Sequence, residues 1–520
     1  MGGMGTPIVG AYCVNLDKGR CITHDEPWKC GICLQVCPQT VYVRDENGKV
    51  QIVNDTACVG CRICQESCPT NALHIKPAES EANTRHIWDS STVEAIHNKA
   101  LTGEYSLRGL GTMGPKTPHF DSIIVIPSQL ASEPPKDKYR EECNLEVVIG
   151  EDTVKNPIRL KVPIIIAAMS FGALSREAKM SLAIGAALSG TIENTGEGGM
   201  LPEEAHLVHG FEKADDKEQK WKPGGHFVVQ WSTGRWGVNL DYLQAGDAVE
   251  IKIGQGAKPG MGGHLLGAKV TEEVSKVRGI PVGTDALSPC RYYDVLSFDD
   301  LKHQVEIIRD MTDYKVPILL KLGPSRPYKD VKLAVKAGVD AISVDGMVGG
   351  TGCSPELVTQ GVGVPTITCI AQAVRALKDM KVHRKVKLFA MGGIRNGLDA
   401  FKAMAMGADG VGIGAAAEIA LGCRSCTACH TGSCRYGLAT GKPELRHFLA
   451  PFIGGQRIAN FIKATTEEIK ILSMLSGHND IRTLSKEDVR ALDLDTAAIC
   501  GIKHVGIDDY YPDYWRKIEE

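Results

Sequence analysis

The sequence lacks an apolar run of the length that a membrane-spanning helix requires, which is about 18 residues. Its first residues also lack a basic segment followed by an apolar stretch, the pattern of a secretory signal. Neither sign of charge dominates: 59 lysine and arginine residues face 62 aspartate and glutamate residues, without a clustered basic excess. We therefore expect a cytoplasmic protein that binds neither a membrane nor nucleic acid, because a phosphate backbone selects a basic surface.

Apolar side chains and cysteines, in contrast, are abundant. With 520 residues, of which 43% are hydrophobic, the chain can bury two or three separate cores. Nine of the 18 cysteines precede residue 69, and four more lie between Cys423 and Cys434. In a reducing cytosol such closely spaced thiolates are typical of metal ligands rather than of disulfides. We therefore expect metal sites at both cysteine groups.

The strongest motif lies in residues 1–78, which we predict to form a ferredoxin-like α+β domain. It reads Cys58-x2-Cys61-x2-Cys64-x3-Cys68-Pro69, the run in which three thiolates hold one cubane cluster and the fourth reaches a second cluster. Zinc sites usually combine paired C-x2-C elements, so zinc is the weaker interpretation. The earlier half repeats the run as Cys30-x2-Cys33-x3-Cys37-Pro38, but Pro27 stands where its first cysteine is expected.

Two [4Fe-4S] clusters are therefore expected in this domain, and one of them lacks a ligand. If the ligands cross over between the halves, one cluster is held by Cys37, Cys58, Cys61 and Cys64. The other cluster then has Cys30, Cys33 and Cys68. Cys21 is the preferred fourth ligand because it lies in the preceding loop, and Cys13 is the less favoured one. Without either cysteine, a [3Fe-4S] cluster or an open iron site results.

After a connector at 79–142, buried apolar strands alternate with helical stretches, which indicates parallel βαβ units. Eight strands are predicted in a domain at 143–440, and this number favours an α/β fold of the closed (β/α)8 TIM-barrel type over a doubly wound sheet. Their ranges are 162–169, 190–195, 227–232, 248–254, 316–323, 341–346, 386–393 and 410–416. The segment 441–520 is predicted to be a helical extension without readable chemistry.

The second cysteine group, GCRSCTACHTGSC, follows the eighth strand, at the barrel end where catalytic loops gather. Cysteines interleaved with glycine, serine and threonine do not form an apolar core, so we favour a metal site. Glycine-rich stretches follow several strands, and those after strands seven and eight lie where barrels bind phosphate groups. These stretches are 194–199, 254–263, 349–352, 391–393 and 412–414.

Six stretches together resemble the FMN-binding synthase domain of glutamate synthases, particularly the short archaeal-type chains with an N-terminal ferredoxin-like module. They are 168–175, 194–199, 234–237, 255–260, 349–352 and Cys423-x5-Cys429-x4-Cys434. The resemblance covers nearly the whole chain. It implies that Cys423, Cys429 and Cys434 hold a [3Fe-4S] cluster beside FMN. Cys426 is an additional cysteine there, and a [4Fe-4S] cluster results if it joins the site.

The resemblance also implies the residues of the flavin site. Met169, Ser170, Gly172 and Gln230 would contact the flavin ring, and Gly392, Gly393, Gly414 and Ala415 would surround its phosphate. Asn194, Thr195, Gly349 and Gly350 are further expected cofactor contacts. Lys321, Gln230 and Ser170 are the expected catalytic residues, with Lys321 near the flavin or a substrate carboxylate. A buried charge at a barrel mouth needs an anionic partner, which favours this role for Lys321. Arg326 and Arg395 are weaker carboxylate candidates.

The implied activity is reductive synthesis of glutamate from 2-oxoglutarate and ammonia via 2-iminoglutarate, with electrons that pass through the clusters to FMN. Ferredoxin or a reductase subunit would supply the electrons. Gly2 rather than a cysteine nucleophile follows Met1, so the glutaminase domain of the long enzymes is expected to be absent, as is their β-helix domain. We therefore expect a separate glutaminase subunit, a separate β-helix subunit and an oligomeric assembly.

Two departures from the long glutamate synthases leave other functions open. Met261 stands where they carry a glutamate, and Met347-Val348 stand where they carry His-Asp. A glutamate-dependent amine transferase, such as an N-methylglutamate synthase, resembles the same barrel but needs no external reductant. An electron-relay subunit that binds FMN for a partner is a third possibility. Barrels related to IMP dehydrogenase share features of the fold but leave the second cysteine group unexplained.

Overall fold

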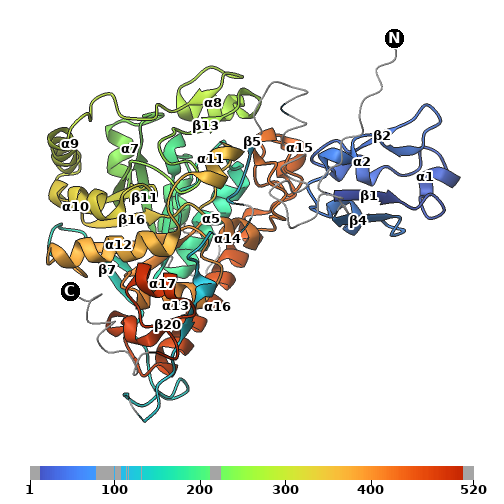
Figure 1. Cartoon of the computed structure of the whole chain (residues 1–520). Helices are drawn as coiled ribbons and strands as arrows, with labels where there is room; N and C mark the ends of the chain where they lie inside the picture. The colour runs from blue at the N-terminus through green and yellow to red at the C-terminus, as the bar shows by residue number, and fades with distance from the viewer. Residues whose placement is uncertain are drawn as a thin grey trace, which may run out of the picture.

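The computed structural model describes residues 12–77, 99, 107–112, 114, 116–130, 132–210 and 224–507. The predicted boundary between residues 78 and 79 lies outside the described residues, as does the end of the C-terminal segment from residue 508. Figure 1 shows a small N-terminal unit, drawn in blue, that stands beside a larger unit containing the barrel. The region around α15 (Pro443–Arg446) lies where the two units meet.

The N-terminal unit combines two pairs of short antiparallel strands with short helices. β1 (Tyr12–Leu16) pairs with β4 (Leu73–Pro77), and β2 (Tyr42–Arg44) pairs with β3 (Val50–Ile52). The helical turns are α1 (Ile22–Asp25), α2 (Ile32–Val36), η1 (Asp55–Ala57) and α3 (Ile63–Glu66). The buried core is small and consists of Val41, Tyr42, Val50, Cys64, Leu73 and Ile75. Cysteines from both halves of the motif pack against these residues, so the cysteine sites are part of the core.

Eight parallel strands form the predicted barrel, and each lies within or next to one of the eight predicted ranges. They are β9 (Ile164–Ile166), β10 (Ile192–Asn194), β11 (His226–Trp231), β12 (Ala248–Lys252), β15 (Ile318–Leu322), β16 (Ala341–Asp345), β18 (Lys387–Met391) and β19 (Gly410–Ile413). The hydrogen-bonded order runs β10-β11-β12-β15-β16-β18-β19-β9. β10 and β9, at the two ends of this order, are not paired as strands. Between them the Lys161 N–H donates to the Gly190 carbonyl at 3.2 Å, which nearly closes the barrel.

Helices surround the strands, as the βαβ pattern predicts. They are α5 (Arg176–Ser189), α6 (Glu204–His209), α7 (Leu240–Ala245), α8 (Glu272–Arg278), α9 (Phe298–Met311), α10 (Pro327–Ala337), α11 (Glu356–Gly361), α12 (Thr366–Asp379), α13 (Gly397–Ala405) and α14 (Ala415–Ala420). Shorter turns are η3 (Gly196–Gly198), η4 (Gly267–Lys269) and η5 (Cys429–Thr431). Local signals set their ends: α5 begins at its Ser175 cap and stops at Gly190, whose φ is +66°. Among the described residues, no helix is both long and apolar enough to cross a membrane.

The 25-residue helix α16 (Pro451–Leu475) supplies the outer helix that the short α14 does not provide. It packs against both α5 and α13, the helices after the first and seventh barrel strands. Glycines permit a close approach: a Cβ at Gly455 would lie 2.4 Å from the Ile184 side chain, and one at Gly185 would lie 2.4 Å from Ile458. The helical layer around the barrel therefore includes α16, which lies in the predicted helical extension 441–520.

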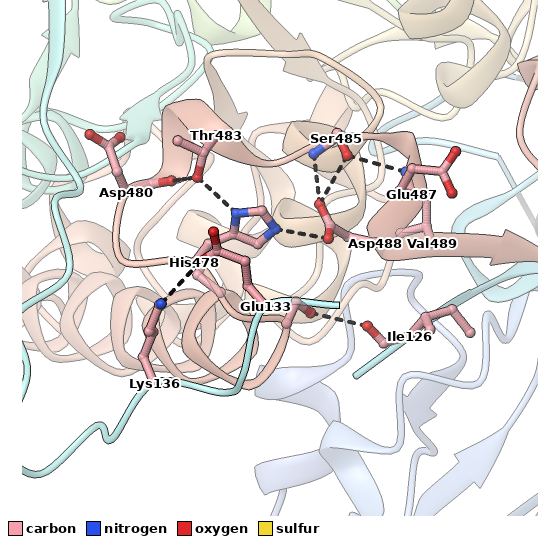
Figure 2. Close-up of polar contacts among 12 residues, drawn as sticks. Ile126, Glu133, Lys136, His478, Asp480, Thr483, Ser485, Glu487, Asp488 and Val489 are labelled. Carbon is pink, nitrogen blue, oxygen red and sulfur yellow. Dashed lines mark hydrogen bonds and ion pairs between the residues drawn. The ribbon is translucent and has the colours of Figure 1, made fainter. Parts of the chain in front are cut away.

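Short strand pairs outside the barrel sheet join further segments of the chain to one another. β5 (Leu107–Arg108) pairs with β17 (Ser354–Pro355), β6 (Ile123–Val125) with β20 (Val489–Ala491), β7 (Val147–Ile149) with β8 (Ile158–Leu160), and β13 (His264–Leu265) with β14 (Ala286–Leu287). The chain also forms η2 (Phe120–Ser122), η6 (Ile481–Thr483), η7 (Lys486–Asp488) and α17 (Leu494–Cys500). Figure 2 shows the C-terminal segment near the connector, where the His478 ring bridges Thr483 and Asp488, each at 2.8 Å.

Candidate active site

A cavity of about 390 Å³ lies at the carboxyl ends of the barrel strands, where TIM barrels carry their active sites. It collects predicted residues from loops that are distant in the sequence. Those that line it are Met169, Ser170, Gln230, Lys321, Gly349, Gly350, Gly392, Gly393, Gly414 and Ala415. Three other predicted flavin contacts, Gly172, Asn194 and Thr195, do not line the cavity.

Asn194 lies behind the wall and acts on a residue that does reach the cavity. Its side-chain amide donates to Glu250 at 3.0 Å, and the amide of Gln230 donates to the same carboxylate oxygen at 2.7 Å. All three side chains are buried within the barrel. Glu250 therefore fixes the orientation of Gln230. Asn194, on the strand next to that of Gln230, holds the Glu250 carboxylate through its own hydrogen bond.

Gly172 and Thr195 are also placed in the surrounding structure. Gly172 has a φ of +95°, and a Cβ there would lie 2.9 Å from the Leu265 side chain, so close packing requires glycine. The Thr195 hydroxyl lies 2.8 Å from the Tyr242 hydroxyl and accepts the Gln230 backbone N–H at 3.1 Å. Both residues shape the loops that carry the cavity-lining side chains.

The loop after β18 fits a phosphate group. Gly392 and Gly393 have φ values of +99° and +74°, and a Cβ at Gly392 would lie 2.9 Å from the Gly346 carbonyl oxygen. Consecutive residues in turn conformations of this kind can direct backbone N–H groups into an anion-binding nest. Gly414, after the adjacent strand β19, lines the same part of the barrel mouth. The residues present therefore suit a phosphate-bearing flavin.

Lys321 has a carboxylate partner at the cavity wall. Its ammonium group lies 3.3 Å from Asp345, which ends the neighbouring strand β16 and also accepts the Gly256 N–H at 2.9 Å. Burial alone would lower the pKa of Lys321, but the carboxylates of Asp345 and Glu250 raise it above its usual range. Lys321 is therefore a firmly charged cation in the site.

The cavity contains more positive than negative charge. Six lysine and arginine residues line it, against the three carboxylates Glu197, Asp345 and Glu418. Burial raises the pKa of Glu418 to about 7, although the charge of Lys269 opposes this shift. Burying a cation away from water costs free energy unless a nearby anion neutralises its charge. The charge distribution favours an anionic ligand.

The shortage of negative charge in the cavity is clearest at Lys258 and Arg278. Burial lowers the pKa of Lys258 to about 8 and that of Arg278 to about 10, although the charge of Glu197 opposes both shifts. Lys258 donates to the Cys353 carbonyl at 2.7 Å, and Arg278 donates to the Phe171 carbonyl at 2.8 Å. Neither carbonyl neutralises a charge. Both cations were absent from the predicted site, although Lys258 lies in the glycine-rich stretch at 255–260.

Glu197 is already committed to another cation. It forms a 2.9 Å ion pair with Lys252 and accepts the Ser288 hydroxyl at 3.1 Å. Burial would raise its pKa, but Lys252 and Lys258 lower the pKa to about 2. This carboxylate therefore remains ionised and offsets only part of the positive charge.

The two arginines that the sequence suggested have other positions. Arg395 borders the cavity, but its guanidinium binds Asp121 and Asp399, the latter at 2.7 Å. Arg326 is exposed, occupies the N-cap position of α10 without a capping side-chain hydrogen bond, and does not line the cavity. Of the departures from the long enzymes, Val348 lines the cavity, whereas Met261 is 42% exposed and lies outside the lining.

The N-terminal cysteines form the two predicted groups of four. Cys21, Cys30, Cys33 and Cys68 line one small void, and Cys37, Cys58, Cys61 and Cys64 line a second. Cys13 is exposed on β1 and lines neither void. This arrangement fits a crossed ligand set with Cys21 as the fourth ligand of the first cluster.

The second cysteine group lies between the N-terminal unit and the cavity. Cys423, Cys426, Cys429 and Cys434 line one void together with Pro38 and Ile63 of the N-terminal unit. Cys429 also lines the large cavity. An ion pair of 3.2 Å joins Arg424 of this loop to Glu66 of the N-terminal unit. The cysteine loop thus contacts both units.

The cysteine groups do not resemble sites for one metal ion. Among the described residues, no three His, Cys, Asp or Glu side chains converge as a single ion would require. Tetrahedral zinc binds its sulfur ligands at about 2.3 Å, so they crowd around one centre. The ligands of a cubane attach to separate iron atoms and therefore stand farther apart. Voids bordered by four cysteines fit iron-sulfur clusters better than zinc.

Among solved structures, the chain is similar to mandelate oxidases. A mandelate oxidase mutant with a monooxide FMN adduct is 18% identical, with a TM-score of 0.43. The similarity covers 72% of this chain and 89% of that chain.

Curated relatives match more of the sequence, and two family models match parts of it. The model described as "Conserved region in glutamate synthase" matches residues 115–479, and the model described as "4Fe-4S dicluster domain" matches residues 28–73. A glutamate synthase large subunit-like protein of Rhizobium meliloti is 41% identical over 82% of this chain and 96% of that protein. The archaeal-type glutamate synthase [NADPH] of Thermotoga maritima is 37% identical over 95% of this chain and 98% of that protein. Since the first model spans most of the sequence and these relatives align over almost their whole length, this chain belongs to the glutamate synthase family of oxidoreductases.

Proposed function

We propose that the chain is the synthase subunit of a glutamate synthase, which converts 2-oxoglutarate, ammonia, two electrons and two protons into L-glutamate and water. One observation carries this proposal: a cavity rich in buried cations shares Cys429 with a void bordered by four cysteines. The cations suit a dicarboxylate beside a flavin phosphate, and the cysteines suit delivery of electrons to that place. The transferase alternative leaves these cysteine sites without a role.

The proposed cofactors are FMN, two [4Fe-4S] clusters in the N-terminal unit and a third cluster in the barrel loop. Cys21, Cys30, Cys33 and Cys68 would hold the first cluster, and Cys37, Cys58, Cys61 and Cys64 the second. Cys423, Cys429 and Cys434 would hold the third. Because the third void borders both the N-terminal unit and the flavin cavity, electrons would pass from the N-terminal clusters through it.

The chain's own groups would bind and orient the reactants. FMN, when bound, supplies the hydride that reduces 2-iminoglutarate, which forms from 2-oxoglutarate and ammonia. Lys258 and Arg278 would bind the substrate carboxylates, because both are buried cations without a sufficient counter-charge. Lys321, held by Asp345, would bind the oxygen of the reacting carbonyl group or a carboxylate. Gln230 and Ser170 would position the flavin ring.

Other components would complete the reaction. The name of the Thermotoga relative contains NADPH, which supports a reductase subunit as the electron donor, and ferredoxin is the alternative. Ammonia would come from a separate glutaminase subunit, and a β-helix subunit would complete an oligomeric assembly. A reducing cytoplasm would keep the many unpaired cysteines available as ligands.

An anaerobic assay of the full chain, replete with clusters and FMN, tests the proposal. We expect L-glutamate to form from 2-oxoglutarate and ammonium only when a low-potential reductant is present. If flavin and clusters are reduced but no glutamate forms, the proposal is wrong. N-methylglutamate formed from glutamate and methylamine without reductant would instead support the transferase function. Electron delivery to a partner without either product would support a relay.

A further inference from the structure

Two loops in different units share one backbone pattern. Each contains three cysteines separated by two residues, and each has left-handed residues two and four positions after the first cysteine. In the N-terminal loop 58–64 these are Gly60 at φ +68° and Arg62 at +59°, and in the barrel loop 423–429 they are Ser425 at +54° and Thr427 at +59°. Positive φ is uncommon outside glycine, and three of these four residues are not glycine. The matched pattern therefore indicates a shared structural requirement.

The sulfur atoms are also held in the same way. In the N-terminal loop, the Gly60 N–H faces the Cys58 sulfur and the Ile63 N–H faces the Cys61 sulfur. In the barrel loop, the Ser425 N–H donates to Cys423 at 3.4 Å, and the Ala428 N–H faces Cys426. Turns that direct N–H groups at an anionic site are typical of iron-sulfur loops. Cys426 thus occupies the position that Cys61 has in the ferredoxin-like motif.

A helical turn follows each loop. In the N-terminal unit, α3 begins at Ile63, immediately before the third cysteine, Cys64. In the barrel loop, η5 begins at the third cysteine, Cys429. The fourth cysteine of the barrel group, Cys434, lies beyond η5 and lines the same void as the other three. The barrel loop therefore provides four sulfur ligands to one volume.

We propose that Cys426 is a cluster ligand and that the third cluster is a [4Fe-4S] cluster held by Cys423, Cys426, Cys429 and Cys434. This inference deepens the cofactor assignment of the proposed function, in which three of these cysteines hold a cluster. A loop that repeats the backbone of a three-thiolate cubane site offers three corners, and Cys434 supplies the fourth.

The added ligand also gives the third cluster a defined orientation. The void that Cys426 lines is also bordered by Pro38 and Ile63, the chain neighbours of Cys37 and Cys64, two proposed ligands of the second N-terminal cluster. Cys429, on the other side, lines the flavin cavity. A cluster held there would therefore receive electrons from the side of the N-terminal unit and pass them on at the side of Cys429. Each cluster accepts and releases one electron at a time, so two passages would reduce one flavin.

Substitution of Cys426 tests the ligand directly, with the full cluster-replete chain and without turnover. The wild type should contain about 12 iron atoms per chain, four for each cubane. In Cys426→Ala the third cluster should lose one iron and become a [3Fe-4S] cluster. An oxidised [3Fe-4S] cluster is paramagnetic, whereas an oxidised [4Fe-4S] cluster gives no electron paramagnetic resonance signal. We expect Cys426→Ala to add about one spin per chain to the oxidised spectrum.

Cys290→Ala is the matched control, because Cys290 is exposed and lies outside both cysteine groups. It should leave the iron content and the spectrum unchanged. An oxidised spectrum that Cys426→Ala does not change would overturn the proposal. If that variant fails to fold, native mass spectrometry of the wild type decides, and about 11 irons with complete N-terminal clusters would count against Cys426. Absence of glutamate formation would bear on the proposed function and not on this ligand.

Discussion

The N-terminal unit and the barrel place different side chains at their centres. Six buried residues form the core of the N-terminal unit, one of them is Cys64, and further cysteines pack around them. The barrel has a continuous apolar core that runs through all eight strands and most of its helices. Some of its buried lysines, such as Lys258 and Lys321, line the cavity at the carboxyl ends of the strands.

The two units therefore differ in how far their folding depends on ligand binding. Small units bury a low fraction of their surface and often depend on a metal, whereas a large barrel buries enough apolar surface without one. The iron-sulfur clusters would thus contribute to the fold of the N-terminal unit. The anions at the barrel mouth would instead bind to a structure that is already formed.

Removal of the clusters should have the largest effect. After oxidation and chelation of the whole chain, we expect residues 12–77 to lose protection against protease, because ligand binding and folding are coupled in small metal-bound units. The barrel should keep its protection, since its core contains no cluster ligand other than those of one surface loop. Limited proteolysis with mass spectrometry would identify the cleaved segments. A protected N-terminal unit after complete iron loss would contradict the comparison.

The sequence predicted the two units to different depths. Eight buried apolar runs predicted every barrel strand, because a strand buried on both faces leaves a continuous apolar run in the sequence. The place of α16 in the helical layer could not be predicted, since only tertiary contacts of Gly455 and Gly185 show it. For the same reason the sequence did not predict Arg278 as a site residue. Arg278 ends a short helix, and only the tertiary fold places it at the cavity.

The cysteines show the opposite situation. Their spacing contained the grouping of seven N-terminal cysteines, and proximity in the chain was the reason to prefer Cys21, which lines the first void. The proposed role of Cys426 could be inferred only from backbone angles, because cysteine spacing alone does not distinguish a cluster ligand from a cysteine that binds no cluster. Asn194 illustrates a further limit, since its motif was recognised while its side chain supports Gln230 through Glu250 instead of reaching the cavity.

Substitution at the barrel mouth should affect chemistry without affecting the N-terminal unit. For Arg278→Met we expect kcat/KM for 2-oxoglutarate to fall about 100-fold, which corresponds to ~2.7 kcal/mol of lost transition-state binding. Arg326→Met is the matched control, because Arg326 follows the neighbouring strand β15 but is exposed outside the cavity. Reduction of the clusters without substrate should be unchanged in both variants. Equal effects of the two substitutions would exclude a binding role for Arg278.

The pH dependence of substrate capture should sharpen this assignment. Lys258 has a pKa of about 8, so it is charged below pH 8 and neutral above it. We expect kcat/KM for 2-oxoglutarate to fall above pH 8, by about tenfold per pH unit, because this parameter reports groups of the free enzyme. In Lys258→Arg the guanidinium stays charged, and the fall should move to higher pH. An unchanged profile in this variant would assign the titration to another group, such as Lys269, whose pKa is also about 8.

The contact between the two units should produce the smallest effect. The side chains of Arg424 and Glu66 are 53% and 50% exposed, and exposed ion pairs of this kind contribute about 0–1 kcal/mol. We expect Glu66→Gln to slow flavin reduction through the N-terminal clusters less than about fivefold, and added salt should reduce the difference. The exchanged pair Glu66→Arg with Arg424→Glu should restore the rate if the ion pair orients the units. A large loss of rate that the exchange does not restore would mean that the ion pair does not set the distance between the clusters. That distance would then depend on Ile63 and Pro38, which border the void of the cysteine loop.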